Sequence, residues 1–162
     1  MAAFYGNPRF DIVAENAGIE SDFSSYDDDE LLEAKLTTGN SQIMLAVKSG
    51  KAIRFEEDKT RPLGRGASGV RGIKLKNESD EVIGMVSVGD INTEILVVSE
   101  NGFGKRSSLD DYRITNRGGK GVKTISITEK TGNLVALKNV SDEDDLMTVS
   151  YTHLTLPTKR IV

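Results

Sequence analysis

The amino-acid sequence predicts an all-β protein built as a propeller-like array of repeated units. The stretches Ile43–Leu75 and Ile95–Ile127 align without a gap at an offset of 52 positions. Short segments rich in Val, Ile and Leu recur between turn-forming residues, and no segment has a convincing helical period. A fixed period of roughly 50 residues is typical of propellers and solenoids rather than of one compact enzyme fold.

The expected strands follow one another along the chain. Each is short and is bounded by Gly, Asn, Asp or Ser. We expect strands at Gln42–Val47, Lys51–Phe55, Gly69–Leu75, Glu81–Val88, Glu94–Ser99, Gly104–Ser107, Gly121–Thr128 and Leu134–Val140. Gly50 and Gly102 close two expected hairpin turns, where glycine tolerates a positive φ. Asp29–Lys35 is expected to form one helical turn at most.

The repeat also divides the chain into units. We expect residues 29–82 and 83–133 to form one blade each, and residues 134–148 to begin a further blade. Residues 1–28 are expected to be an acidic, poorly ordered linker or the remnant of a preceding blade. Residues 149–162 resemble a translated sequencing adapter, so we interpret them as an artefactual tail and exclude them from fold reasoning.

Composition limits the chemistry that the chain can perform. Cysteine is absent, which excludes disulfides and thiolate chemistry and fits a cytoplasmic compartment. No run of 18 apolar residues and no secretory signal occurs, so no membrane association is expected. Gly64–Gly69 matches G-x-G-x-x-G formally, but β-type sequence follows it where a dinucleotide fold needs a helix. We expect no catalytic residue, no metal site and no cofactor in this chain.

Charge alternates in sign with the repeat. Residues 1–33 carry one Arg and nine acids, a net charge of −8, whereas residues 46–76 carry nine bases and three acids, a net charge of +6. Residues 77–102 hold six acids and no base, and residues 103–130 hold seven bases and three acids. If the repeats share an orientation, their basic segments line one surface. That arrangement favours a polyanionic partner, and the alternative is a set of solvated loops without a partner.

The most specific basic motif is Arg117-Gly118-Gly119-Lys120-Gly121. Glycines let a backbone approach phosphate closely, Arg can bind phosphate through two nitrogens, and Lys adds a point charge. Few aromatic or amide side chains lie among these cations, which favours backbone contact without base readout. The expected DNA-binding residues are Arg117, Gly118, Gly119, Lys120, Gly121, Lys123, Arg113, Arg106 and Lys105, and in the earlier copy Arg65, Arg61, Arg54, Arg71 and Lys51.

This motif resembles the box Q-R-R-G-G-K-G of the C-terminal domain of the DNA gyrase A subunit. Residues 115–121 occupy the seven box positions, with Thr115 and Asn116 in place of Gln and Arg. The flanking sequences also resemble consecutive blades of that domain, from about Glu30 to Met147. We therefore interpret both copies in this chain as later blades of such an array.

The resemblance implies a fold, a function and partners. The fold is a partial β-pinwheel of four-stranded blades whose basic rim wraps double-stranded DNA. The parent enzyme would be an ATP-dependent type II topoisomerase that introduces negative supercoils, with ATP and Mg²⁺ bound elsewhere. The implied protein partners are the rest of the gyrase A subunit and the gyrase B subunit, in the nucleoid-associated cytoplasm of a bacterium.

Two other interpretations remain open from the sequence. The chain could be the corresponding domain of the topoisomerase IV A subunit, which binds DNA without the same box. It could instead be a propeller-like module that binds a protein, whose binding would be insensitive to salt. A nucleotide-dependent enzyme is disfavoured, because helices and acid–base groups are missing.

Overall fold

The computed structural model describes residues 2–6, 12–14, 30–62, 69–89 and 92–147. The strands are β1 (Ala2–Gly6), β2 (Ile12–Ala14), β3 (Glu30–Lys35), β4 (Gln42–Val47), β5 (Lys51–Glu56), β6 (Val82–Val88), β7 (Glu94–Ser99), β8 (Gly104–Ser108), β9 (Val122–Lys123) and β10 (Leu134–Val140). Two 3₁₀ turns, η1 (Glu57–Lys59) and η2 (Leu109–Asp111), follow β5 and β8. The described part of the chain has no α-helix, which confirms the expected all-β class.

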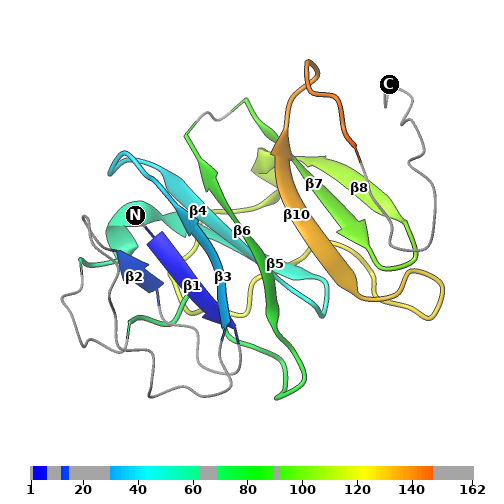
Figure 1. The fold of residues 1–162 in the computed structure, drawn as a ribbon, viewed down its shortest axis with the longest axis horizontal. Coiled ribbons are helices and arrows are strands. Elements are labelled where there is room, and N and C mark those ends of the chain that lie inside the picture. Colours follow the sequence, from blue (N-terminus) through cyan, green and yellow to red (C-terminus); the bar gives the residue numbers. More distant parts are fainter. Residues whose placement is uncertain (1, 7–11, 15–29, 63–68, 90–91, 148–162) are drawn as a thin grey trace.

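The strands form three antiparallel sheets that follow one another across the molecule (Figure 1). Their strand orders are β2-β1-β3, β6-β4-β5-β9 and β10-β7-β8. The edge strands β3, β6 and β10 begin at Glu30, Val82 and Leu134, which is the spacing of the sequence repeat, and β6 contacts both others. The turns η1 and η2 keep the same spacing. The sequence repeat is therefore a structural repeat in which equivalent edges meet.

The second repeat supplies the fourth strand of the first blade. β9 pairs with β5 through Lys51↔Lys123 and Ala52↔Val122, although the two strands lie far apart in the sequence. The opposite edge of the same sheet is β6, which pairs with β4 along its whole length. The blade boundary expected between residues 82 and 83 therefore needs correction, because β6 hydrogen-bonds to β4 and the sheet continues to Val88.

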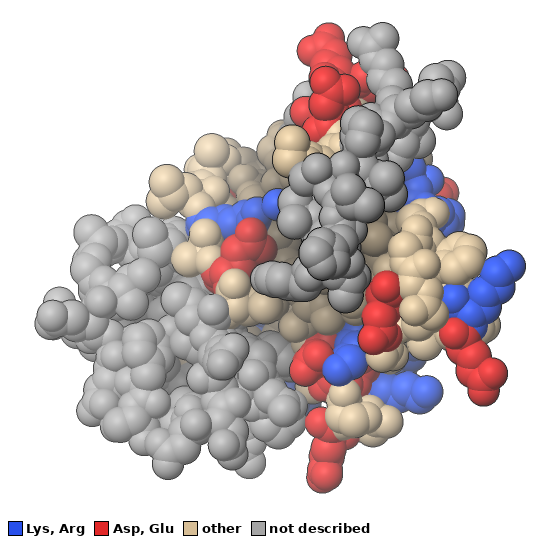
Figure 2. Space-filling view, turned by 45° about the vertical axis from the view of Figure 1, so that its right-hand side comes forward, with Lys and Arg blue, Asp and Glu red and all other residues tan. Residues whose placement is uncertain are grey.

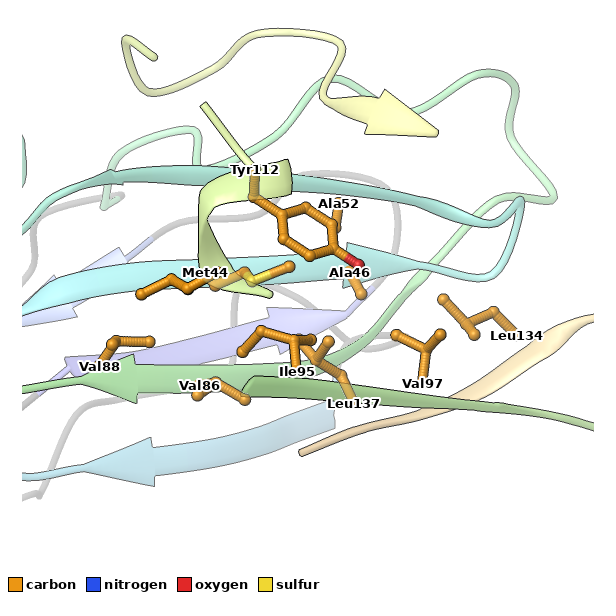
Figure 3. Packing of buried hydrophobic residues seen from close by; sticks show 11 residues of the cluster. Met44, Ala46, Ala52, Val86, Val88, Ile95, Val97, Tyr112, Leu134 and Leu137 are labelled. Carbon is orange, nitrogen blue, oxygen red and sulfur yellow. The ribbon is translucent and has the colours of Figure 1, made fainter. Parts of the chain in front are cut away.

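The core lies on both faces of the middle sheet. Alternate residues of β4 belong to two separate clusters: Ile43 and Leu45 face one, and Met44 and Ala46 face the other. The second cluster also contains residues of the β10-β7-β8 sheet and Tyr112, so it fills the space between the two blades (Figure 3). Burial on both faces explains why β4 is apolar almost throughout instead of alternating.

The two repeats use the same turn chemistry. Gly50 and Gly102 both have φ of 79°. Their N–H groups donate to Val47 O and Ser99 O respectively, each at 2.9 Å. Both expected hairpin turns are thus confirmed, and each needs glycine because L-residues with a side chain are strained at this φ.

Three expectations about elements are wrong. Asp29–Lys35 is expected to form one helical turn at most, but Glu30–Lys35 is strand β3. Gly69–Leu75 is not a strand; it packs as an irregular segment against the first core cluster through Val70 and Ile73. Of Gly121–Thr128, Val122–Lys123 alone is a strand.

The ends of the chain are described in part. β1 pairs with both β2 and β3, so part of residues 1–28 forms strands, and the rest of that segment lies outside the described residues. The tail at residues 149–162 lies outside them as well.

Candidate nucleic-acid interface

The basic motif lies on a segment of the second repeat that crosses over to the first blade. This segment, Leu109–Thr124, is called the arm below. Its η2 turn is anchored by Leu109 and Tyr112, which are 1% and 3% exposed. The Tyr112 ring points toward Ala52 and Ala46 (Figure 3), and its hydroxyl accepts a hydrogen bond from Thr124 Oγ1 at 3.0 Å. The arm is therefore held at both ends by the interface between the blades.

Arg54 fastens the start of the arm and is not a surface residue. Its side chain is buried, with 7% of the residue exposed. Nη1 donates to the carbonyl oxygens of Leu109 at 2.8 Å and Tyr112 at 3.0 Å, and Nε donates to Gln42 Oε1 at 2.8 Å. Burial lowers the pKa of this guanidinium, against the opposing influence of Asp110. The expectation that Arg54 contacts DNA is wrong, because its donors are already used inside the protein.

The turn at residues 116–119 packs against residues 71–74 of the first repeat. Gly118 N donates to Gly72 O at 2.7 Å, and Lys74 N donates to Gly119 O at 2.8 Å. These two bonds place basic residues from both repeats beside one another. The backbones of residues 71–74 and 116–119, which carry Arg71, Lys74 and Arg117, are therefore neighbours.

Arg117 holds this region together. Its Nη1 donates to Arg71 O at 2.7 Å and its Nε donates to Lys59 O at 3.0 Å. The guanidinium is partly exposed and keeps further donor capacity, since arginine has five N–H donors. Arg117 therefore joins the backbones of Lys59 and Arg71, and it forms no ion pair with a described residue.

The glycines of the motif make close approaches to the first blade. A Cβ on Gly121, whose φ is 69°, would lie 2.6 Å from Ala52 O. A Cβ on Gly119 would lie 3.3 Å from Ile53 Cδ1. Packing of the arm against β5 explains these glycines, and the N–H of Gly118 is already donated to Gly72.

The remaining expected cations divide into exposed and paired groups. Arg61, Arg71, Lys105, Arg113, Lys120 and Lys123 are exposed and form no ion pair with described residues. Lys51 is partly exposed opposite Lys123. Arg106 differs, because it pairs with Glu94 and, at 2.5 Å, with Asp142. Arg65 lies outside the described residues.

Lys105 and Arg106 belong to another part of the surface. Both lie on β8, in the sheet at the right of Figure 1, whereas the other described cations that were expected to bind DNA lie on the arm, on β5 or in the loops that follow β5. On the face drawn in Figure 2, blue and red side chains alternate among the described residues.

The name basic seam is used below for the described cations around the arm, namely Lys51, Lys59, Arg61, Arg71, Lys74, Arg113, Arg117, Lys120 and Lys123.

Sequence reasoning missed two members of the seam. Lys59 and Lys74 are not among the expected contacts, although both are exposed and hydrogen bonds tie their backbones to Arg117 and Gly119. Neither has a basic counterpart in the second copy of the repeat, where Asp111 and Ser126 stand. The one available signal was the excess of bases in residues 46–76.

The described residues were also searched for a metal site and for a membrane-spanning helix. No group of three His, Cys, Asp or Glu side chains that could hold a metal occurs among them. Likewise, the described segments include no helix of the length and apolarity needed to cross a membrane.

Comparison with known proteins places these features in a family. Residues 42–88 and 93–150 match the family described as DNA gyrase C-terminal domain, beta-propeller. The chain is 46% identical over 143 residues to the DNA gyrase A subunits of Staphylococcus epidermidis (strain ATCC 12228 / FDA PCI 1200) and of Staphylococcus aureus (strain MRSA252). These matches cover 88% of this chain and 16% of the relatives, so the chain spans a small part of their length.

Two solved structures share the architecture. A DNA gyrase A C-terminal domain superposes with a TM-score of 0.71 at 25% identity, covering 90% of this chain and 50% of the other. A C-terminal domain of DNA topoisomerase IV superposes with a TM-score of 0.70 at 19% identity, covering 87% and 47%. The second likeness shows a common fold alone.

Proposed function

The chain belongs to the DNA gyrase C-terminal domain family, and on that premise we propose that its basic seam binds the phosphate backbone of double-stranded DNA. The observation that carries the proposal is the pair of hydrogen bonds that join residues 71–74 to residues 116–119. They bring exposed cations of two repeats into one region. Apart from Lys59, which pairs with Asp58 at 3.3 Å, the cations of the seam form no ion pair with described residues. Such side chains can neutralise phosphates and release the counterions condensed on DNA.

The seam suits backbone contact better than base readout. Its described members are Lys and Arg on irregular loops and strand ends, with no helix to enter a major groove. Bending a site of 20–30 base pairs by 40–90° costs on the order of 1–6 kcal/mol, which phosphate neutralisation must exceed. Binding should therefore depend steeply on salt and little on sequence.

The parent protein is proposed to be an ATP-dependent type II topoisomerase of the bacterial, nucleoid-associated cytoplasm. The chain would act there as a DNA-wrapping segment, with ATP, Mg²⁺ and strand cleavage handled by the rest of the A subunit and by the B subunit. The support for this step is the 46% identity to gyrase A subunits. Ligation of nicked circles in the presence of the protein distinguishes wrapping from simple binding, since wrapping shifts the linking number of the products.

The salt dependence of DNA affinity tests the seam directly. Each lost phosphate contact reduces the log–log salt slope by about 0.9. We expect Lys120→Gln to reduce the slope by about that amount on every duplex sequence, because Lys120 is exposed and unpaired among the described residues. The matched control is Lys138→Gln on β10, an exposed lysine away from the seam, which should leave the slope unchanged. A slope near zero for the unmodified chain, or equal effects of both variants, would contradict the proposal.

A further inference from the structure

A pocket lies where β6 and β10 begin, beside Leu32 of β3. Its volume is about 460 Å³, which is within the range of sites that bind small molecules. β6 lies between β3 and β10 and contacts both strands (Figure 1). None of the residues that line the pocket belongs to the basic seam, so the pocket is a separate feature of the molecule.

The apolar wall of the pocket comes from equivalent positions of the two repeats. Ile83 and Val135 occupy one such pair of positions, and Val82 and Leu134 occupy another. Val82 and Leu134 are buried, whereas Val135 and Leu32 are 49% and 41% exposed. The wall is therefore uncovered in part and can bury the aliphatic portion of a ligand.

Backbone hydrogen bonds fix the frame of the pocket. Lys48 N donates to Glu81 O at 2.8 Å, and Glu100 N donates to Asn133 O at 2.8 Å. Leu134 N donates to Lys48 O at 3.1 Å, which joins the frames of the two repeats. A frame that is held in this way costs little to order when a ligand binds.

The polar side chains of the two repeats differ in charge. Lys48 Nζ donates to Glu81 Oε1 at 2.9 Å, and this hydrogen bond raises the pKa of the Lys48 ammonium. The equivalent positions of the second repeat hold Glu100 and Asn133, so an anion replaces the cation and a neutral amide replaces the anion. Glu100 Oε2 accepts from Asn133 N and Nδ2, each at 3.3 Å. Glu100 forms no ion pair with a described residue, and the pocket has a net negative charge.

We propose that this pocket binds a primary aliphatic amine, whose ammonium group pairs with Glu100 while its alkyl chain lies on the apolar wall. The ammonium of the ligand does for Glu100 what Lys48 does for Glu81 in the first repeat. A carboxylate beside uncovered aliphatic side chains favours a ligand that carries both a cation and an apolar chain. This binding does not depend on the proposed contact with DNA.

Titration of the chain with hexan-1-amine at neutral pH and constant ionic strength tests the pocket, with the backbone amide NMR signals as the readout. We expect saturable shifts at Ile83, Glu100 and Val135. Hexan-1-ol lacks the charge and should bind about threefold more weakly or worse, because it cannot pair with the carboxylate. Methylamine lacks the chain and should bind about tenfold more weakly or worse. The proposal is overturned if either compound binds as tightly as hexan-1-amine, or if the shifts do not saturate or lie outside the pocket.

Substitutions test the role of the carboxylates. Glu100→Gln should weaken the binding of hexan-1-amine about threefold, because glutamine keeps an acceptor for Asn133 but lacks the charge. Lys48→Met should strengthen binding by about the same factor, since Glu81 then has no ammonium partner within the chain. Glu129→Gln is the control and should leave the affinity unchanged, because Glu129 is exposed and does not line the pocket. Equal effects of Glu100→Gln and Glu129→Gln, or weaker binding by Lys48→Met, overturn the proposal.

Discussion

Gly121 allows the arm to lie directly on β5. Its φ of 69° and the 2.6 Å that would separate a Cβ from Ala52 O both exclude a side chain. We expect Gly121→Ala to lower the free energy of unfolding by about 2–4 kcal/mol, of which about 1–2 kcal/mol is left-handed backbone strain and the rest is overlap. Urea denaturation measures this loss.

Gly102→Ala provides the matched control for this prediction. Gly102 also has a positive φ, but its Cβ would enter open space. The control should therefore cost about 1–2 kcal/mol, the strain alone. Equal losses for the two variants would show that overlap with Ala52 adds nothing to the cost of Gly121→Ala. The presence of Gly121 in the motif would then need an explanation other than close packing on β5.

Residue chemistry alone could not separate surface arginines from buried ones. Arg54 and Arg106 stand at equivalent places in the two copies and share charge and spacing. The burial of Arg54 arises from partners far along the chain, the carbonyls of Leu109 and Tyr112. Backbone carbonyls carry no side-chain signature, so no pattern in the sequence marks them as acceptors.

At the level of elements, Asp80 joins the hairpin turn of the first blade to the segment before β6. It is 2% exposed. Its Oδ1 accepts from Ser49 N at 2.9 Å, and its Oδ2 accepts from Ser49 Oγ at 2.7 Å and Lys76 N at 3.1 Å. We expect Asp80→Ala to cost about 3 kcal/mol in urea denaturation, because several donors lose a charged acceptor.

Glu78→Ala is the control for Asp80, since Glu78 is exposed in the same loop. A surface change of this kind should stay within about 0.5 kcal/mol of the unmodified chain. If Asp80→Ala were equally mild, the turn would be held by β4–β5 pairing alone.

Elements with local signals were predictable, and those that depend on distant pairing were not. The turns of Gly50 and Gly102 have short-range glycine signals, and the apolar strands β4, β6, β7 and β10 match their predicted positions closely. The segment 69–75 has an equally apolar pattern but packs as an irregular layer, because the turn at 116–119 takes its hydrogen bonds. Likewise, the extent of β9 depends on its pairing with the distant edge of β5.

The arrangement of the blades has a consequence for unfolding of the whole molecule. The arm begins in the second repeat and completes the sheet of the first, and Leu109 and Tyr112 belong to the core cluster between the sheets. Loss of either sheet would expose that cluster. We therefore expect the β6-β4-β5-β9 and β10-β7-β8 sheets to unfold in one transition.

Native-state hydrogen exchange measures this coupling. Amides of Leu45 in β4 and Val97 in β7 should show the same opening free energy, since both would exchange through global unfolding. Leu109→Ala should lower both by a similar amount, about 2–5 kcal/mol for a buried leucine, even though Leu45 lies in the other core cluster. A Val97 amide that exchanges well before Leu45, or a Leu109→Ala effect confined to one sheet, would mean that each repeat unfolds independently. Independent unfolding would in turn leave the basic seam incomplete whenever the second repeat opens, because Arg117, Lys120 and Lys123 reach the first blade through the arm.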